Sequence, residues 1–310
     1  MIYTVTLNPA LDKTVEVSSL TLNAVNRITA MRTDPGGKGI NVSKVVKKLG
    51  GRSIATGILG GKTGQTILAA LDSAGIETQF LFAEGETRTN LKIIDPVAHT
   101  NTDINEPGLT VSAEVLDALL QKLLEMLTPG DIVVLSGSLP KGCPVDIYRA
   151  WTQECTAHGA KVILDADGRQ LAAGLEGKTY MIKPNHHELA ALLGKKMDTP
   201  QELAQAARSL MEQYSIKKVV VSMGGDGALY LTADETIHAE GLKVPVGSTV
   251  GAGDSVVAAL AFAEENGMSL AEAARLSTAT GAANVMCSGT QAAEYDTIRE
   301  LLPRVVLHKL

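Results

Sequence analysis

Residues 248–254 (Ser-Thr-Val-Gly-Ala-Gly-Asp) place two glycines and a carboxylate directly before the apolar run 255–263, which predicts a helix. The first N–H groups of a helix lack internal partners and carry the positive end of its dipole, so such a turn can bind an anion. Asp254 could take a proton from a hydroxyl that attacks a phosphoryl group held there. The segment therefore predicts phosphoryl transfer, or else a plain turn with Asp254 as a helix cap.

Residues 36–41 (Gly-Gly-Lys-Gly-Ile-Asn) form a second glycine-rich turn before a predicted helix. Glycines let the backbone approach a ligand, while Lys38 supplies a cation and Asn41 supplies an amide. The spacing matches neither the Walker A loop nor the Gly-x-Gly-x-x-Gly dinucleotide motif. Taken alone, the segment could also be an ordinary turn.

Residues 87–90 (Thr-Arg-Thr-Asn) contain a possible phosphate contact. Arg88 offers a planar, permanently charged fork that suits a phosphate, and Asn90 adds a neutral donor. The alternative is a surface arginine on a strand.

Residues 183–188 (Lys-Pro-Asn-His-His-Glu) close a predicted strand and open a helix. Asn185 and Glu188 share a helix face, which suits magnesium bound directly or through water, and Lys183 could meet a polyphosphate. The same spacing fits a capping box equally well. No third ligand is spaced to join His186 and His187, so we expect no metal on them.

Two further segments follow predicted strands. Residues 222–228 (Ser-Met-Gly-Gly-Asp-Gly-Ala) predict a strand-to-strand turn whose backbone could lie under a nucleotide, and residues 136–140 contribute Ser138. Ligands of open α/β sheets bind at the carboxyl ends of the strands, so we expect these segments to meet in one crevice.

Short apolar strands alternate with helices, which predicts an α/β fold with a mostly parallel sheet covered on both faces. Two stretches without room for crossover helices predict a small separate lid of antiparallel strands. The expected core is residues 1–10, 35–85 and 106–310, and the expected lid is residues 11–34 and 86–105. The predicted core strands are residues 2–7, 52–58, 131–136, 161–165, 180–183 and 218–222. The predicted helices are residues 40–49, 63–74, 113–127, 145–158, 185–193, 200–212, 252–266 and 270–287.

The composition limits the possible partners. The chain has 310 residues, 45% of them hydrophobic and 3% aromatic, a net charge of −6 and three cysteines without metal-ligand spacing. This charge disfavours nucleic acid and anionic membranes, and no apolar run reaches the ~18 residues of a membrane span. We expect a cytoplasmic protein of a reducing compartment that binds phosphates through a few local cations.

Taken together, these segments resemble the ribokinase-like carbohydrate kinases of the phosphofructokinase-B family over the whole chain. Residues 36–41 and 248–254 look like the two signatures of that family. Residues 6–12 and 87–90 look like the branch that phosphorylates ketohexose phosphates. Residues 183–188 and 222–228 look most like those of 1-phosphofructokinases, with tagatose-6-phosphate kinases second. The resemblance implies a ribokinase-like fold, ATP and Mg²⁺ as cofactors, and a homodimer formed through the β lid.

The resemblance also implies a role for each candidate residue. Asp254 would be the catalytic base, and the N–H groups of Gly251, Ala252 and Gly253 the anion hole. Sugar hydroxyls would be held by Asp12, Gly37 and Asn41. The phosphate already on the sugar would be bound by Lys38, Arg88, Asn90 and Ser138, with Arg27 as a weaker candidate. Lys183 would contact ATP phosphates, and Asn185 and Glu188 would organise magnesium through water. The nucleotide would be flanked by Ser222, Gly224, Gly227 and Asn284.

The reaction that this implies is ATP-dependent phosphorylation of the free primary hydroxyl of a ketohexose monophosphate. Fructose 1-phosphate is the first expectation, followed by tagatose 6-phosphate and then fructose 6-phosphate. A silent sugar-phosphate-binding regulator on the same fold is the alternative of another class, although the base, anion hole, Lys183 and Glu188 are all intact.

Overall fold

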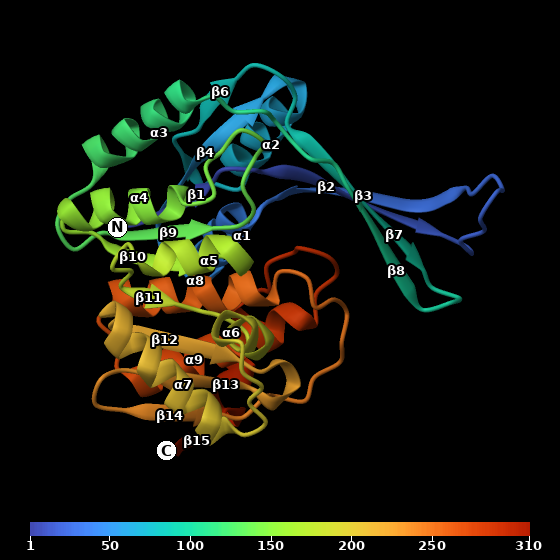
Figure 1. The fold of residues 1–310 in the computed structure, drawn as a ribbon. Helices are drawn as coiled ribbons and strands as arrows, with labels where there is room; N and C mark the ends of the chain where they lie inside the picture. The colour runs from blue at the N-terminus through green and yellow to red at the C-terminus, as the bar shows by residue number, and fades with distance from the viewer.

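A computed structural model describes residues 1–310 as a large sheet layered between helices, with a smaller sheet projecting from one side (Figure 1). The strand order of the large sheet is β15-β14-β13-β12-β11-β10-β9-β1-β4-β5, and β6 pairs with β4. Pairing is parallel from β5 to β12 and antiparallel from β12 to β15. The strands are β1 (Ile2–Thr6), β4 (Ser53–Gly60), β5 (Glu77–Thr78), β6 (Leu81–Ala83), β9 (Ile132–Ser136), β10 (Lys161–Asp165), β11 (Met181–Ile182), β12 (Lys218–Ser222), β13 (Ala228–Leu231), β14 (Thr236–Ala239) and β15 (Leu307–Lys309).

Helices cover both faces of this sheet because each presents an apolar stripe to it. One core cluster joins the sheet to α3, α4, α5, α6 and α7, and another joins it to α1, α8, α9 and α10. The helices are α1 (Lys38–Lys48), α2 (Gly61–Ser73), α3 (Ala113–Met126), α4 (Ile147–Ala157), α5 (Gly168–Leu175), α6 (His186–Leu193), α7 (Pro200–Tyr214), α8 (Ala252–Glu265), α9 (Leu270–Val285) and α10 (Tyr295–Leu301), with short 3₁₀ turns η1 (Gly224–Asp226) and η2 (Leu302–Arg304). No helix is long and apolar enough to cross a membrane.

The smaller sheet, which we call the lid sheet, contains four strands in the order β3-β2-β7-β8. They are β2 (Ala10–Val17), β3 (Ile28–Gly36), β7 (Arg88–Asp95) and β8 (Thr100–Asn105). The outer pairs are antiparallel, as predicted, but β2 and β7 run parallel, so the expectation of an all-antiparallel lid is wrong. Parallel pairing is possible because α1, β4 and α2 lie between the two strands and act as the crossover.

The predicted α/β class is confirmed, and so is the turn between β12 and β13 at residues 222–228. The first helix after the Gly36–Gly37 turn begins at Lys38 rather than at Ile40, because Gly37 adopts a φ of 113° that breaks the preceding strand. Sequence analysis did not predict α5, α10, or the strands β5, β6, β14 and β15 near the two edges of the sheet. All of them are short, so their periodicity carries little signal.

Candidate active site

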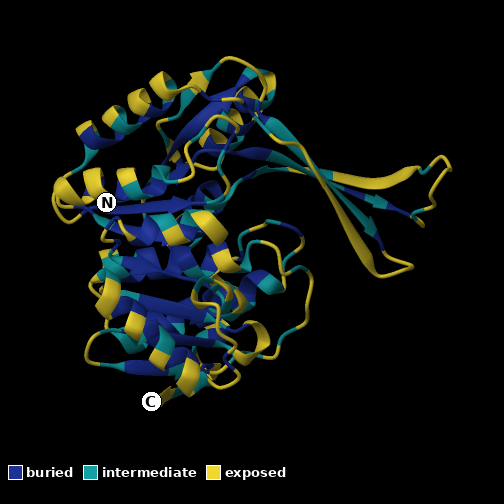
Figure 2. Ribbon diagram, in the orientation of Figure 1, coloured by how far each residue is buried: buried dark blue, intermediate teal, exposed yellow.

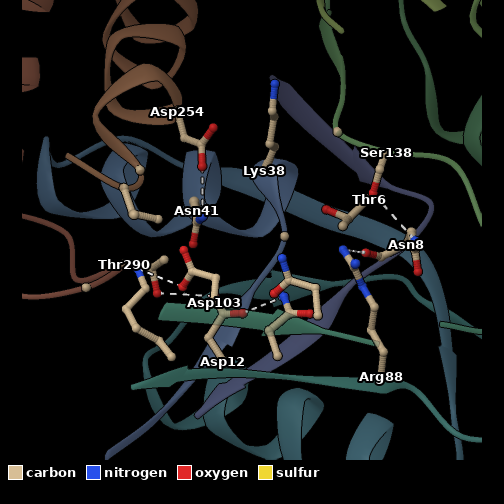
Figure 3. Close-up of a pocket in the computed structure, with 18 of the residues that line it drawn as sticks. Thr6, Asn8, Asp12, Lys38, Asn41, Arg88, Asp103, Ser138, Asp254 and Thr290 are labelled. Carbon is tan, nitrogen blue, oxygen red and sulfur yellow. Dashed lines mark hydrogen bonds and ion pairs between the residues drawn. The ribbon is translucent and has the colours of Figure 1, made fainter. Parts of the chain in front are cut away.

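A polar cavity of ≈ 380 Å³ lies where the carboxyl ends of the central strands meet the lid sheet (Figure 3). Of its 21 lining residues only one, Val250, is hydrophobic. The cavity collects most of the sequence-predicted sugar and catalytic residues: Asp12, Gly37, Lys38, Asn41, Arg88, Asn90, Ser138, Gly251 and Asp254. Such a lining suits a small ligand that carries many hydroxyl or phosphate oxygens.

Asp254 lies in the first turn of α8 and is buried, with its side chain facing the cavity. Its Oδ2 accepts a hydrogen bond of 2.8 Å from Nδ2 of Asn41. Burial, together with the negative charge of Asp165, raises the pKa of Asp254 to about 6, against the opposing effects of Lys38, the Asn41 hydrogen bond and Lys183. A carboxylate with this pKa can accept a proton near neutral pH.

The turn before α8 exposes backbone donors beside Asp254. Gly251 adopts a left-handed φ of 81°, which a side chain rarely tolerates, and the Ala252 N–H donates only a long 3.4 Å bond to the Thr249 carbonyl. A Cβ added at Gly253 would lie 3.6 Å from Nζ of Lys183, so that ammonium faces this turn. The turn and Lys183 together form an electropositive concavity of the kind that holds phosphoryl groups.

Asp165, at the end of β10, is a buried residue that sequence analysis did not single out. Its carboxylate lies between two lysines, 3.2 Å from Nζ of Lys183 and 3.3 Å from Nζ of Lys38. Burial would raise the pKa of Asp165, but the two ammonium groups outweigh burial and lower it. Burial also opposes the charge of Lys38, but Asp165 and Asp254 hold the pKa of that ammonium above its usual value.

Lys38 therefore lies at the Asp254 end of the cavity, and Figure 3 shows its side chain pointing away from Arg88. We expected Lys38 and Arg88 to bind one phosphate together. The structure instead places Lys38 with Lys183 around Asp165, at the opposite end of the cavity from Arg88.

Arg88 lies at the other end of the cavity with Asn8 and Ser138. Its Nη2 donates to the Asn8 carbonyl at 3.0 Å, and Nδ2 of Asn8 lies 3.5 Å from Oγ of Ser138. Asn8 is a second residue that sequence analysis did not select, although it belongs to the segment 6–12 used for the resemblance. Arg88 has no carboxylate partner, so its charge is available to an anion.

Three buried polar atoms of cavity-lining residues have no hydrogen-bond partner in the protein: Nε of Arg88, Oδ1 of Asn90 and Oγ of Ser136. An unpaired buried polar group is costly, and a polar ligand would satisfy it. The other polar atom of Asn90, Nδ2, donates 2.9 Å to Oδ1 of Asp12. Gly36 allows this arrangement, because a Cβ there would lie 2.2 Å from Oδ2 of Asp12.

The predicted nucleotide residues lie on the neighbouring strand ends. Asn185 and Glu188 form a capping box, in which each side chain accepts a 2.8 Å bond from the other residue's N–H. No cluster of three or more His, Cys, Asp or Glu residues could hold a metal ion. Asn185 bridges to Ser222, which brings the β12 end beside α6.

The glycines of the β12–β13 turn differ in their surroundings. Nothing lies within 4 Å of a Cβ built on Gly224, whereas one on Gly227 would lie 1.9 Å from the Ala239 carbonyl. Gly224 therefore leaves open space beside the turn, and Gly227 is required for the packing of the hairpin.

Two predicted residues lie away from the cavity. Arg27 is exposed on the β2–β3 loop and does not line the cavity. Asn284 is buried in α9, where its Nδ2 donates 3.4 Å to the Val250 carbonyl and supports the turn before α8 from behind.

The chain is similar to known proteins both in sequence and in structure. A family model described as pfkB family carbohydrate kinase matches residues 5–297. The chain is 38% identical over 310 residues to a 1-phosphofructokinase of Bacillus subtilis strain 168, covering 100% of both. It is 37% identical over 309 residues to a 1-phosphofructokinase of Xanthomonas campestris, covering 98% of this chain and 97% of the relative.

A solved structure of phosphofructokinase-2 from Escherichia coli, in complex with fructose-6-phosphate, has a similar fold. Its TM-score is 0.92 at 30% sequence identity, over 98% of each chain. The similarity extends over the lid as well as the core, because almost no part of either chain is left out.

Proposed function

The chain belongs to the pfkB family of carbohydrate kinases and is an ATP-dependent sugar-phosphate kinase; from this premise we propose that its substrate is fructose 1-phosphate and its product fructose 1,6-bisphosphate. The two curated relatives described above are 1-phosphofructokinases, and they support this choice of sugar. The observation that carries the proposal is a buried Asp254 at one end of the cavity and, at the far end, an arginine that has no carboxylate partner and whose Nε is unsatisfied.

Asp254 acts as the general base in this proposal. Its carboxylate accepts the proton of the sugar's primary hydroxyl as that oxygen bonds to the γ-phosphorus and the bond to the ADP oxygen breaks. Gly251, Ala252 and Gly253 direct their N–H groups at the transferring phosphoryl group. Lys38 and Lys183 neutralise its charge, which is the main demand of phosphoryl transfer.

The remaining cavity residues orient the sugar. Asp12, Gly37 and Asn41 hold its hydroxyls, and Arg88, Asn90 and Ser138 bind the phosphate that it already carries. This placement puts the substrate phosphate at one end and the reacting hydroxyl at the other. Alignment of that kind supplies much of the rate enhancement in kinases.

ATP would lie along the strand ends beside Ser222, Gly224 and Gly227, with Mg²⁺ bound to its phosphates. Asn185 and Glu188 are engaged in their capping box, so we assign them to the magnesium only through water. Asn284 acts on the nucleotide side by supporting the anion-hole turn. ATP as phosphoryl donor and three free thiols support a cytoplasmic location.

A homodimer through the lid sheet is part of the proposal. The face of the lid sheet that points away from the cavity exposes Met31 and Ile104, each more than half accessible. Figure 2 shows the projecting lid strands as largely exposed or half-exposed. Packing against the same face of a second copy would cover these side chains.

The test is kcat/KM with Mg-ATP for fructose 1-phosphate, tagatose 6-phosphate and fructose 6-phosphate, measured side by side. We expect a preference of ~100-fold or more for fructose 1-phosphate, equivalent to about 2.7 kcal/mol of transition-state stabilisation. A preference for either 6-phosphate would overturn the assigned sugar while keeping the kinase.

A further inference from the structure

The lid sheet presents two rows of polar side chains to the cavity, and we call each row a rung. Sequence analysis found residues of the first rung only. Across the sheet, Asp12 pairs with Asn90 and Asn90 with Asn105. The second rung lies two residues further along each strand, where Thr14 pairs with Lys92 and Lys92 with Asp103. Side chains two residues apart share a face of a strand, and all six residues line the cavity.

Within the protein, Lys92 and Asp103 of the second rung are not hydrogen-bonded to each other. The Lys92 side chain is only 15% exposed, yet its Nζ donates no hydrogen bond and its nearest carboxylate oxygen, Oδ1 of Asp103, is 3.7 Å away. That distance exceeds a hydrogen bond, so the two charges attract each other without satisfying their donors and acceptors. The stem of Lys92 is buried, but its ammonium reaches the cavity and keeps donors that a ligand can take up.

The charge of this pair indicates which part of the ligand it meets. Lys92 is balanced by Asp103, whereas Arg88, four residues earlier on β7, has no carboxylate partner. A dianionic phosphate is favoured beside the unbalanced arginine and is repelled by the carboxylate of Asp103. A hydroxyl suits the pair, because it can accept from the ammonium and donate to the carboxylate at once.

The position of the second rung also separates it from the phosphate end. Its neighbour is Gly289, because a Cβ there would lie 3.6 Å from Oγ1 of Thr14. The next residue, Thr290, contacts the first rung, with its Oγ1 3.5 Å from Oδ2 of Asp12. Figure 3 shows Asp103 and Thr290 across the cavity from Arg88 and Ser138. The rung therefore faces the ring of the sugar.

We propose that Lys92, together with Asp103, binds a ring hydroxyl of the sugar phosphate and sets which ketohexose epimer the enzyme accepts. The inference rests on the proposed function, since it places a sugar phosphate in this cavity. A hydroxyl with the wrong configuration would leave both charges unsatisfied, and sites that hydrogen-bond a substrate hydroxyl discriminate strongly against its absence.

The experiment compares two substrates that differ only in the configuration of one ring hydroxyl, fructose 1-phosphate and tagatose 1-phosphate. The readout is the ratio of their kcat/KM values in wild type, Lys92→Met and Asp103→Asn. We expect the wild-type ratio to fall at least tenfold in Lys92→Met and in the same direction in Asp103→Asn, with the KM for ATP within twofold.

Lys13→Met is the matched control, because Lys13 lies on the same strand as Thr14 but does not line the cavity. It should leave the epimer ratio unchanged. Asp103 is half-exposed, so Asp103→Asn keeps the test available if Lys92→Met does not fold.

Three results would overturn the inference: a wild-type preference below about threefold, an unchanged ratio in both variants, or an equal loss for both epimers. The last would make Lys92 a general binding residue. If wild type instead prefers 6-phosphate esters, the proposed substrate fails. The same ratio, measured with fructose 6-phosphate and tagatose 6-phosphate, then still decides the role of Lys92.

Discussion

At the scale of single residues, the two buried carboxylates of the site, Asp165 and Asp254, have different roles in our proposal. Asp165 holds Lys38 and Lys183 in place, and its negative charge helps to keep Asp254 basic. Without Asp165 the two ammonium groups would act on Asp254 unopposed and lower its pKa. Burial raises the pKa of Asp254 most, and Asp165, which need not touch the sugar, raises it further.

Replacing the proposed base tests its role most directly. We expect Asp254→Asn to lower kcat by at least ~10³, because the amide cannot accept the hydroxyl proton while the hydrogen bond from Asn41 is kept. ATP binding, measured by calorimetry, should persist. Near-normal turnover in this variant would contradict the mechanism.

The pH dependence follows from the same carboxylate. The pKa of Asp254 is raised to about 6, so kcat/KM should fall as the pH drops through 6 and the base becomes protonated. Asp165→Asn removes a negative charge that raises this pKa, so the acid limb should move to lower pH. Asp167→Asn, a nearby acid that also lines the cavity, is the control and should move it less. A shift to higher pH in Asp165→Asn would refute the assignment.

Residue types and spacing pointed to cavity residues at both ends of the site, but only where the residues carry a local signal. Asp254, Asn41 and Arg88 were found because glycine-rich turns and an arginine beside polar residues are local signals. Asp165 ends a strand with an ordinary apolar pattern, so nothing local marks it. Asn284 lies on a helix close to the site, but only the three-dimensional packing shows that it faces the back of a turn.

At the scale of elements, helix α8 is fixed at the end opposite Asp254. The side chain of Glu264, only 7% exposed, accepts hydrogen bonds from Lys161 of β10 at 2.6 Å, Lys218 of β12 at 2.5 Å and the Tyr180 hydroxyl at 2.8 Å. These bonds join the helix to two central strands. They restrict sliding of α8, which would otherwise displace Asp254 and the anion-hole turn.

Glu264→Gln should therefore destabilise the fold without altering chemistry. We expect the free energy of unfolding to fall by about 1–3 kcal/mol, below the usual cost for a fully buried pair because both lysines are partly exposed. Denaturant titration measures the loss, and the KM values should stay within twofold. Glu265→Gln is the control: its carboxylate is more exposed, so a smaller loss is expected. Equal losses would show that the Glu264 network adds nothing.

Elements with long periodic patterns were predictable, and their pairing across distant segments was not. The helices 113–127 and 200–212 lie within a few residues of α3 and α7. The strand-like pattern of residues 14–17 and 89–94 is equally plain, but pattern alone does not give their relative direction. The parallel β2–β7 pair depends on the intervening core.

At the scale of the whole molecule, the lid sheet has a polar face toward the cavity and an apolar face away from it. Met31 lies opposite Val15, on the face that Thr14 does not occupy, and Ile104 lies opposite Leu91. Alternation along each strand thus serves a ligand on one side and, in our proposal, a second subunit on the other.

Met31→Glu should convert the proposed dimer to monomers, because it places a charge at the centre of an apolar contact. Light scattering after gel filtration should give twice the 32.5 kDa chain mass for wild type and a single chain mass for the variant. Val246→Glu, which changes another exposed apolar residue, this one outside the lid, is the control and should remain dimeric. A monomeric wild type would contradict the dimer proposal.

The parallel pairing of β2 and β7 in the lid sheet affects how the protein folds. Asp12 and Asn90, which touch across β2 and β7, are 78 positions apart in the chain. Contacts of such long range are slow to form, because the loop must close before they contribute any stability. The crossover elements between them belong to the core, so core folding shortens that search. During folding, the anion-binding turn and its lysines can therefore assemble first, and the sugar half of the cavity matures last.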